Sequence, residues 1–449
     1  MKMRVWLILC SLAVLSGCKT TPVAEIHLKG RLADMGSREV SMEYTGVTGD
    51  FGASRDVMLK TDEEGYFDTI LPLREPTYFN ISRNILYLSP GDDLGVYLTP
   101  DTRQATFKGK GSEAQLFLKD RLYPKGGSFL FSGRNVKANF EETKKEVDAL
   151  ASFKLAQLDT LEGVTKRFKE NERIRVKANL LNSYLTYALY SRENAGKSRE
   201  EQKEWYKRFV VSITPDVNQL MREIARNKYL DIIDVRDVIV YNLDQAEFMQ
   251  GVEITPEMRE IKEALQVLAK LDSSTDPEVI LSMEEKTKSF QHEGIVSELQ
   301  EKIRNVKSLM TGQPAHEIIM TDVDGNEVLL SSFKGKNIYL DCWATWCGPC
   351  IQESPAFGAL SEKYKDKDIV FIQLSTDNSR KTWLSYLKQK ESVVPQFNSV
   401  DNEGLRVNWQ IKYIPRFILI DKEFNIVQSF APRPSDPEIA EHLDALLAK

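Results

Sequence analysis

Two cysteines in the last third of the chain have the spacing of a redox-active pair. Cys347 and Cys350 are separated by Gly348 and Pro349; they follow an apolar run typical of a buried strand, and they open a segment with helical periodicity. A cysteine at a helix N-terminus lies beside unpaired backbone N–H groups and the positive end of the helix dipole, which stabilise its thiolate. The second cysteine faces the same side and is placed to resolve a mixed disulfide. The pattern therefore predicts thiol–disulfide exchange.

The other cysteines confine sulfur chemistry to this pair. Cys10 lies in an N-terminal segment expected to be removed, Cys18 directly follows that segment and is expected to carry lipid, and Cys342, on the predicted strand before the pair, is expected to be a small buried core residue. An exported chain without further cysteines has no framework of structural disulfides. A structural zinc site would need two more ligands, and none of the four histidines has ligand spacing near the pair. The disulfide Cys347–Cys350 is therefore expected to work without a metal or another cofactor.

The residues around the pair resemble the thioredoxin signature. The match runs from Asp341 to Cys350, in the sequence DCWATWCGPC. With Pro314 and Asp324–Gly325 upstream, the segment from Gln313 to the C-terminus is similar to the TlpA/ResA-type branch, which is tethered to the membrane and lies on its outer side. The resemblance implies a thioredoxin fold and a thiol–disulfide oxidoreductase, an enzyme that would reduce disulfides of exported proteins and draw electrons from an unidentified membrane donor.

The resemblance also assigns roles to residues near the pair. Asp341 matches a buried carboxylate whose raised pKa would let it shuttle a proton for Cys350, with an exposed Asp at a strand end as the alternative. Glu353 matches a glutamate that would tune thiol acidity or help to bind the substrate, or else it is inert on the helix surface. Trp343 and Trp346 would shield the sulfurs and offer an apolar contact surface for the substrate.

A second segment is expected to face the disulfide. Tyr413–Ile414–Pro415 matches the thioredoxin segment that carries a cis-proline, and a cis bond would place the backbone of Ile414 to pair with a substrate strand. An ordinary trans-proline turn is the alternative. Arg416 follows where threonine is usual, and it would place a cation near the substrate groove. Ile414 and the Gly–Pro dipeptide favour a reductase over an oxidase or isomerase.

Alternating strands and helices are predicted to position these residues. Thr311–Gly312–Gln313–Pro314 marks a boundary, and beyond it Asp324–Gly325 indicates a hairpin between Glu317–Thr321 and Glu327–Leu330. The elements predicted next are a strand at Asn337–Asp341, a helix at Cys347–Tyr364, a strand at Ile369–Leu374, a helix at Arg380–Lys390, strands at Phe417–Leu419 and Ile426–Phe430, and a helix at Asp436–Ala448. This order predicts, for residues 312–449, a central mixed sheet with helices on both faces.

The chain ahead of this domain begins with a β-rich region, predicted to span residues 24–112. Its predicted strands include Gly65–Leu71, Tyr78–Ser82, Ile85–Leu88 and Gly95–Leu98. Short strands at this spacing predict an antiparallel sandwich. With Ser89–Pro90–Gly91–Asp92 and Gly109–Lys110–Gly111–Ser112, the region loosely resembles a β-rich domain of unknown function that precedes thioredoxin domains in some bacterial lipoproteins.

Residues 113–311 are predicted to form a helical domain, because glycine and proline become scarce and apolar residues recur at the helical period. Thr255 and Pro256 indicate an N-cap and first turn. Tyr184, Tyr187 and Tyr190 form a stripe that is interpreted as helix packing, with a ligand-stacking face as the alternative. The whole chain is thus expected to be a multidomain α+β protein.

The first residues have the layout of an export signal. A charged stretch precedes an apolar run from Val5 to Leu15, which is too short to cross a bilayer. Leu15–Ser16–Gly17–Cys18 resembles the lipobox of bacterial lipoproteins, which implies that residues 1–17 are removed, Cys18 is lipidated and residues 18–23 form a tether. A plain signal peptide is the alternative. The implied location is the cell envelope, lipid-anchored and facing the periplasm, on either the inner or the outer membrane.

Composition limits the remaining function classes. The 449 residues are 42% hydrophobic and 28% charged, as in ordinary globular proteins, and the net charge of −6 has no basic cluster opposite it. Nucleic acid is therefore not an expected partner. Two other functions remain as alternatives. One is a binding or assembly lipoprotein whose β-rich and helical regions grip a partner. The other is a thiol peroxidase, although its signature places threonine where this chain has Ala344.

Overall fold

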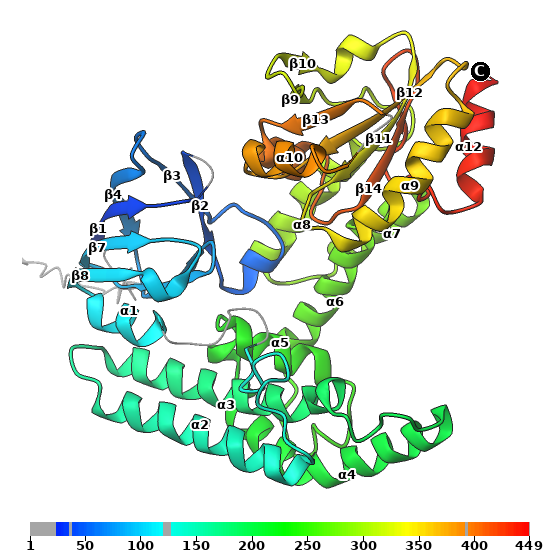
Figure 1. The fold of residues 1–449 in the computed structure, drawn as a ribbon. Coiled ribbons are helices and arrows are strands. Elements are labelled where there is room, and N and C mark those ends of the chain that lie inside the picture. Colours follow the sequence, from blue (N-terminus) through cyan, green and yellow to red (C-terminus); the bar gives the residue numbers. More distant parts are fainter. Residues whose placement is uncertain (1–23, 36–37, 120–126, 391–393, 449) are drawn as a thin grey trace, which may run out of the picture.

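The computed structural model describes residues 24–35, 38–119, 127–390 and 394–448. The predicted signal peptide at residues 1–17, the tether at 18–23 and the lipidation site Cys18 lie outside the described residues. Figure 1 shows a β-rich part, a helical part below it, and a second sheet with helices at the C-terminal end. The chain is therefore a multidomain α+β protein.

The N-terminal part consists of two four-stranded sheets packed face to face. Their orders are β4-β1-β7-β8 and β3-β2-β5-β6. The strands are β1 (Ala24–Leu32), β2 (Glu39–Tyr44), β3 (Val57–Lys60), β4 (Tyr66–Leu73), β5 (Thr77–Ile81), β6 (Asn84–Leu88), β7 (Asp93–Leu98) and β8 (Thr106–Lys110). Alternate residues of β2 and β7 are buried, as expected of strands with one face on a core. Side chains from both sheets, such as Ile26 and Met42, share that core.

This sandwich differs from the prediction in one pairing. Strand β1 lies between β4, which is antiparallel to it, and β7, which is parallel to it. Parallel strands need a long crossover, and here five strands lie between β1 and β7 along the chain, four of them in the other sheet. The sheet is therefore mixed, and the expectation of a purely antiparallel sandwich is wrong at this pair.

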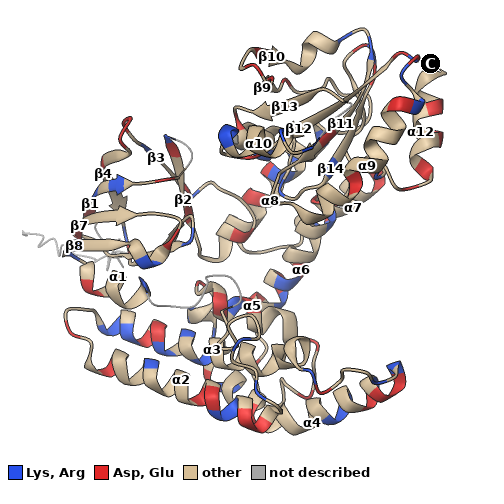
Figure 2. Cartoon of the chain, in the orientation of Figure 1, with Lys and Arg blue, Asp and Glu red and all other residues tan. Residues whose placement is uncertain are grey.

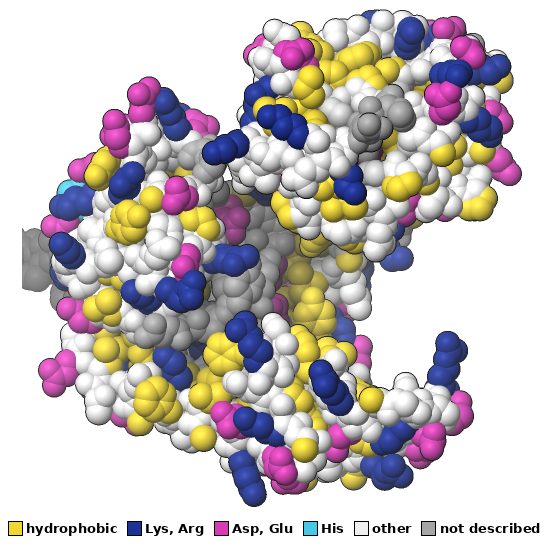
Figure 3. All heavy atoms as spheres, viewed as in Figure 1, with side chains coloured by type: hydrophobic (Ala, Val, Ile, Leu, Met, Phe, Trp, Pro, Cys, Tyr) yellow, Lys and Arg dark blue, Asp and Glu magenta, His cyan; other side chains and the backbone are white. Residues whose placement is uncertain are grey.

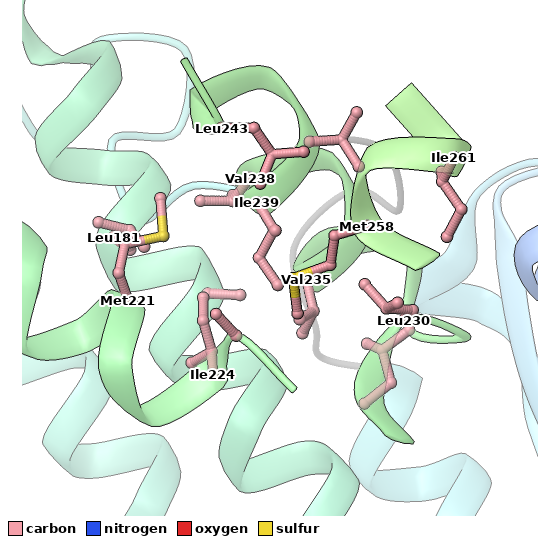
Figure 4. Close-up of a cluster of buried hydrophobic side chains, with 14 of the residues drawn as sticks. Leu181, Met221, Ile224, Leu230, Val235, Val238, Ile239, Leu243, Met258 and Ile261 are labelled. Carbon is pink, nitrogen blue, oxygen red and sulfur yellow. The ribbon is translucent and has the colours of Figure 1, made fainter. Parts of the chain in front are cut away.

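The middle of the chain is helical. Its helices are α1 (Ser112–Lys119), α2 (Phe140–Thr160), α3 (Lys166–Tyr190), α4 (Arg199–Ile224), α5 (Ile233–Asn242), α6 (Pro256–Leu271), α7 (Pro277–Thr287) and α8 (Glu293–Lys307). Figure 4 shows apolar side chains from α3 to α6, among them Leu181, Met221, Ile239 and Met258, meeting in one core. Figure 2 shows acidic and basic residues interspersed along α2, α3 and α4, and most of these on α2 and α4 are not buried. The helices thus bury one face and leave the other in solvent.

Two local signals in this region can be compared with the structure. Thr255 caps α6, because its hydroxyl accepts a hydrogen bond from the N–H of Met258, and Pro256 occupies the first turn. In the tyrosine stripe, Tyr184 and Tyr187 are buried in the helical core, which agrees with the helix-packing interpretation, whereas Tyr190 is 43% exposed and is not part of that core. Within the described residues, no helix is both long enough and apolar enough to cross a membrane.

The C-terminal part is built on a seven-stranded mixed sheet of order β10-β9-β13-β12-β11-β14-β15. The strands are β9 (Ile319–Thr321), β10 (Glu327–Leu329), β11 (Asn337–Trp343), β12 (Ile369–Ser375), β13 (Gln396–Ser399), β14 (Arg416–Ile420) and β15 (Ile426–Gln428). The helices are α9 (Gly348–Lys363), α10 (Arg380–Leu387), α11 (Asn402–Asn408) and α12 (Glu438–Leu447). Helices α9 and α12 cover one face, and α11 covers the other.

Most elements predicted for this part are present, and two were missed. The predicted hairpin is β9–β10, which pair in antiparallel register. The predicted strand before the cysteines extends two residues further, to Trp343, and helix α10 ends at Leu387, three residues before its predicted end. Strand β13 and helix α11 were not predicted. Figure 3 shows that the C-terminal and helical parts face each other across a recess.

Candidate active site

The two cysteines lie at the N-terminus of α9 and are joined by a disulfide, with 5.3 Å between their Cα atoms. Cys347 is the N-cap residue, and its sulfur accepts a hydrogen bond of 3.2 Å from the N–H of Cys350. That N–H would favour a thiolate at Cys347 in the reduced pair. Cys347 is 5% exposed and Cys350 is fully buried, so Cys347 is the sulfur that an incoming molecule meets first.

The loop that leads into α9 is held by a buried carboxylate. Asp377, just beyond the end of β12, accepts hydrogen bonds from the N–H of Thr345 at 2.9 Å and from its hydroxyl at 2.7 Å. Ser375 donates to the same carboxylate at 2.7 Å, and Asn398 donates to the backbone oxygen of Asp377. Strands β12 and β13 and this loop are therefore tied together two residues before Cys347.

Aromatic side chains surround the sulfurs. Trp343 and Trp383 are buried in one cluster with both cysteines, and Ile414 packs against it. Trp346, by contrast, is 71% exposed. The two predicted tryptophans thus lie in different places. Trp343 shields the pair, while Trp346 offers an apolar surface beside it.

Asp341 lies fully buried on β11. Burial raises the pKa of its carboxyl to about 7, a hydrogen bond from Gln373 opposes that shift, and the charge of Glu353 adds to it. Gln373, its neighbour on β12, donates to Oδ2 at 2.8 Å, whereas Oδ1 has no hydrogen-bond partner among the described residues. Gln373 also lies 3.4 Å from the hydroxyl of Ser354, which donates to the backbone oxygen of Cys350. The alternative of an exposed Asp is therefore excluded.

Glu353 is buried one turn beyond Cys350. Its carboxylate accepts hydrogen bonds from the N–H and the hydroxyl of Ser435 at 3.1 and 2.9 Å, and Arg433 lies 3.8 Å away. The inert surface position that was one alternative is excluded. Glu353 ties α9 to the loop before α12, and its charge raises the pKa of Asp341.

The segment opposite the disulfide has the predicted proline geometry. The peptide bond between Ile414 and Pro415 is cis. Tyr413, immediately before it, is 78% exposed, while Ile414 is half-buried against the cluster that contains the cysteines. This loop therefore presents its backbone and one exposed aromatic side chain beside the disulfide.

The expectation for Arg416 is wrong. Its side chain is buried and donates hydrogen bonds to the backbone oxygens of Gln410 and Ser429, at 3.0 and 3.3 Å, with its guanidinium over the ring of Phe430. The reason is strand geometry, because alternate residues of a strand face opposite sides of the sheet. Arg416 pairs with Cys342, on the face away from Asp341. It therefore stabilises the cis-proline loop from behind and adds no cation to the groove.

Cys342 is fully buried and unpaired, as predicted, and burial raises the pKa of its thiol. Sequence reasoning missed four residues of this site: Gln373, Ser354, Asp377 and Trp383. Gln373 and Ser354 had no local signal. The position of Asp377 just after a predicted strand was a usable signal, because functional side chains gather at the carboxyl ends of such strands. In the part of the chain that the structure describes, no cluster of three or more His, Cys, Asp or Glu residues could hold a metal.

Comparison with known proteins agrees with this geometry. The Redoxin family matches residues 310–446. The thiol-disulfide oxidoreductase ResA of Bacillus thuringiensis subsp. konkukian is 30% identical over 133 residues, which cover 29% of this chain and 76% of that protein. The thioredoxin-like protein YneN of Bacillus subtilis is 27% identical over 138 residues, or 30% and 80% of the two chains.

Among solved structures, a putative thiol-disulfide oxidoreductase from Bacteroides vulgatus shares 55% identity, covering 31% of this chain and 99% of that chain, with a TM-score of 0.31. The matches to ResA, to YneN and to this structure each cover less than a third of the chain, and the Redoxin match begins at residue 310. The family match and the bonded cysteine pair lead to the same conclusion: the chain belongs to the ResA-like thiol–disulfide oxidoreductases, with the thioredoxin-fold domain at its C-terminal end.

Proposed function

We propose that this chain is a lipid-anchored reductase of disulfides in exported proteins. Thiol–disulfide oxidoreductase activity follows from the family. The location and the substrates rest on the sequence, where an export-signal layout ends in a lipobox-like Cys18. The observation that carries the proposal is the placement of the reactive pair, with Cys347 at a helix N-cap and Cys350 buried behind it.

The reaction follows from this order of exposure. The thiolate of Cys347 attacks one sulfur of a substrate disulfide, and the other substrate sulfur leaves as a thiol after taking up a proton. Cys350 then attacks the sulfur of Cys347 in the mixed disulfide. The second substrate thiol is released, and the enzyme is left with the Cys347–Cys350 bond. Two electrons from a thiol donor in the membrane return the pair to its reduced form.

Asp341 is proposed to take the proton from Cys350 in the second step. A carboxyl with a pKa of about 7 exchanges a proton readily near neutral pH. Its Oδ1 atom has no hydrogen-bond partner among the described residues, which leaves an acceptor for that proton. Gln373 and Ser354 support this role, because they connect the carboxylate to the backbone of Cys350.

Trp346, Ile414 and Pro415 are proposed to contact the substrate. Trp346 supplies an exposed apolar surface next to Cys347. The backbone of Ile414 lies beside the cysteine cluster, where an extended peptide would add to it as a strand.

The proposal is tested with Cys347→Ser and reduction of insulin or glutathione disulfide, with dithiothreitol as the electron donor. We expect the variant to lose all catalysed reduction, because no thiolate remains to attack. Cys342→Ala is the matched control and should keep wild-type rates, since Cys342 lies on the other face of the sheet. Wild-type protein that reduces neither substrate would contradict the proposal.

A second function is favoured by the size of the unmatched region. The family match begins at residue 310, so the β sandwich and helices α1 to α8 lie outside it. In this alternative, the β sandwich and the helical part would bind a partner, and the redox activity would be secondary to that binding. A deletion strain separates the two functions. Complementation by Cys347→Ser, but not by a chain lacking residues 24–311, would favour the binding function.

A further inference from the structure

A cleft of about 680 Å³ lies where the three parts of the molecule meet. One wall is the segment of the β sandwich around Tyr44 and Asp50. The helical part contributes α5, α6 and α8, and the thioredoxin-fold domain contributes residues between Arg406 and Tyr413. Figure 1 shows β2, α5, α6 and α8 around this place.

The cleft and the redox site share one loop. Lys412 and Tyr413 line it, and they directly precede the cis bond between Ile414 and Pro415. Ile414 in turn packs against the cluster that contains Cys347. A substrate polypeptide could pair with this loop while its disulfide contacts Cys347. The residues next to the substrate cysteine would then lie in the cleft.

The walls of the cleft are fixed to one another by buried contacts. The ammonium of Lys302, on α8, pairs with Asp272 and donates a hydrogen bond to Gln410 of the thioredoxin-fold domain. On the other side, Arg236 of α5 pairs with Asp50 of the β sandwich at 2.6 Å. Burial and hydrogen bonding of this kind hold the three parts in one arrangement, so the cleft exists before anything binds.

The lining favours cationic ligands. It carries seven carboxylates and three cationic side chains, and two of those cations, Lys302 and Lys412, already pair with Asp272. Arg236, outside the lining, pairs with Asp50, and the carboxylates still outnumber the cations when it is counted. The excess negative charge lies in a concave site, where the surrounding protein focuses the field. Tyr241 and Tyr413 are 77% and 78% exposed and add flat apolar surfaces that order at low entropic cost.

We propose that this cleft binds an extended, lysine- or arginine-bearing segment of the substrate polypeptide, next to the cysteine that Cys347 attacks. The proposal rests on the proposed function and names its substrate class. It also gives the β sandwich and the helices a role, because each supplies part of the binding surface. The substrate is selected by the charge beside its disulfide.

The test uses two synthetic peptides of equal length, each with one cysteine disulfide-bonded to glutathione. One carries Lys and Arg beside the cysteine, and the other carries Glu and Asp. With the full-length protein and dithiothreitol as the reductant, we expect kcat/KM for the cationic peptide to exceed that for the anionic peptide by about tenfold at low salt. The preference should shrink as salt is added, because exposed charges are screened.

Two exposed carboxylates of the lining, Glu43 on β2 and Glu301 on α8, provide the variant. Glu43→Gln with Glu301→Gln should lower the ratio of the two kcat/KM values about fivefold, chiefly through KM for the cationic peptide. The matched control is Glu25→Gln with Glu278→Gln, exposed residues of β1 and α7 that do not line the cleft, and it should keep the wild-type ratio.

The outcomes separate this inference from the proposed function. Reduction of both peptides at equal rates, or an equal fall of the ratio in the control, would overturn the inference and leave the reductase intact. Failure of the wild-type protein to reduce either peptide or glutathione disulfide would instead overturn the proposed function.

Discussion

The carboxyl of Asp341 ionises near neutral pH because the fold removes it from water. In an unfolded chain this group ionises near pH 3.8, whereas in the folded protein its pKa is about 7. The folded state therefore holds more protons than the unfolded state between these values. It follows that stability falls as pH rises through this window and stays lower above pH 7.

Asp341→Asn should remove the loss of folding stability that occurs as pH rises, because asparagine does not ionise. A change of pKa from 3.8 to about 7 corresponds to roughly 4 kcal/mol. In the oxidised protein, the free energy of unfolding of the variant should therefore exceed that of wild type by up to this amount at pH 8 and by little at pH 4. Urea unfolding followed by tryptophan fluorescence measures it, since four of the six tryptophans lie in residues 312–449. Glu362 is an exposed carboxylate on α9, and Glu362→Gln is the control. It should leave the free energy of unfolding unchanged at both pH values. An equal effect of Asp341→Asn at both pH values would show that the pKa is not raised.

At the scale of the element, the position of Cys347 depends on how the turn between β11 and α9 is held. Asp377 accepts from the N–H and hydroxyl of Thr345 and from Ser375. Backbone and side-chain donors at one buried carboxylate fix the turn more firmly than helix capping alone would. The helix N-terminus and the reactive sulfur are thereby positioned from the neighbouring strand.

Asp377→Ala should loosen this turn. Three donors would lose their acceptor in a buried place, so we expect a loss of stability of about 1–3 kcal/mol. The rate of disulfide reduction should fall about tenfold as well, because the sulfur of Cys347 is no longer held in line for attack. Activity and urea unfolding are measured together, with the exposed Asp366→Ala as the control. Reduced stability with unchanged activity would mean that Asp377 serves only the fold.

At the scale of the whole molecule, one buried cation joins the helical part to the thioredoxin-fold domain. Lys302 pairs with Asp272 and bonds to Gln410, whose backbone oxygen accepts from Arg416 behind the cis-proline loop. Burial lowers the pKa of Lys302, and the charge of Asp272 opposes that shift. The substrate loop is therefore supported through an interdomain contact.

Lys302→Met should weaken this junction by about 3 kcal/mol, because the carboxylate of Asp272 loses its closest cation while still largely buried. The double variant Lys302→Met with Asp272→Asn should recover part of that loss, since neither charge then remains unpaired. The free energy of unfolding of the single and double variants measures this coupling. Additive losses in the two single variants would show that the pair does not act as a unit.

Much of the site followed from the sequence because its signals are local. The cysteine spacing, the proline in the first turn of α9 and the Asp–Gly hairpin each depend on residues a few positions apart. The segment with the cis-proline was found in the same way, from a short match. Interactions within one turn or one hairpin are specified by neighbouring residues, so a single sequence is enough to predict them.

Other features were decided only by the tertiary structure. Strand β13 and helix α11 are four and seven residues long, too short for a clear periodic signal. The contact of Gln373 with Asp341 and the burial of Arg416 depend on which strands are neighbours and in what register. The parallel pairing of β1 with β7 and the cleft between the three parts depend on contacts between residues far apart in the chain. Such contacts form only when distant segments are packed together, and no local pattern of residues encodes that packing.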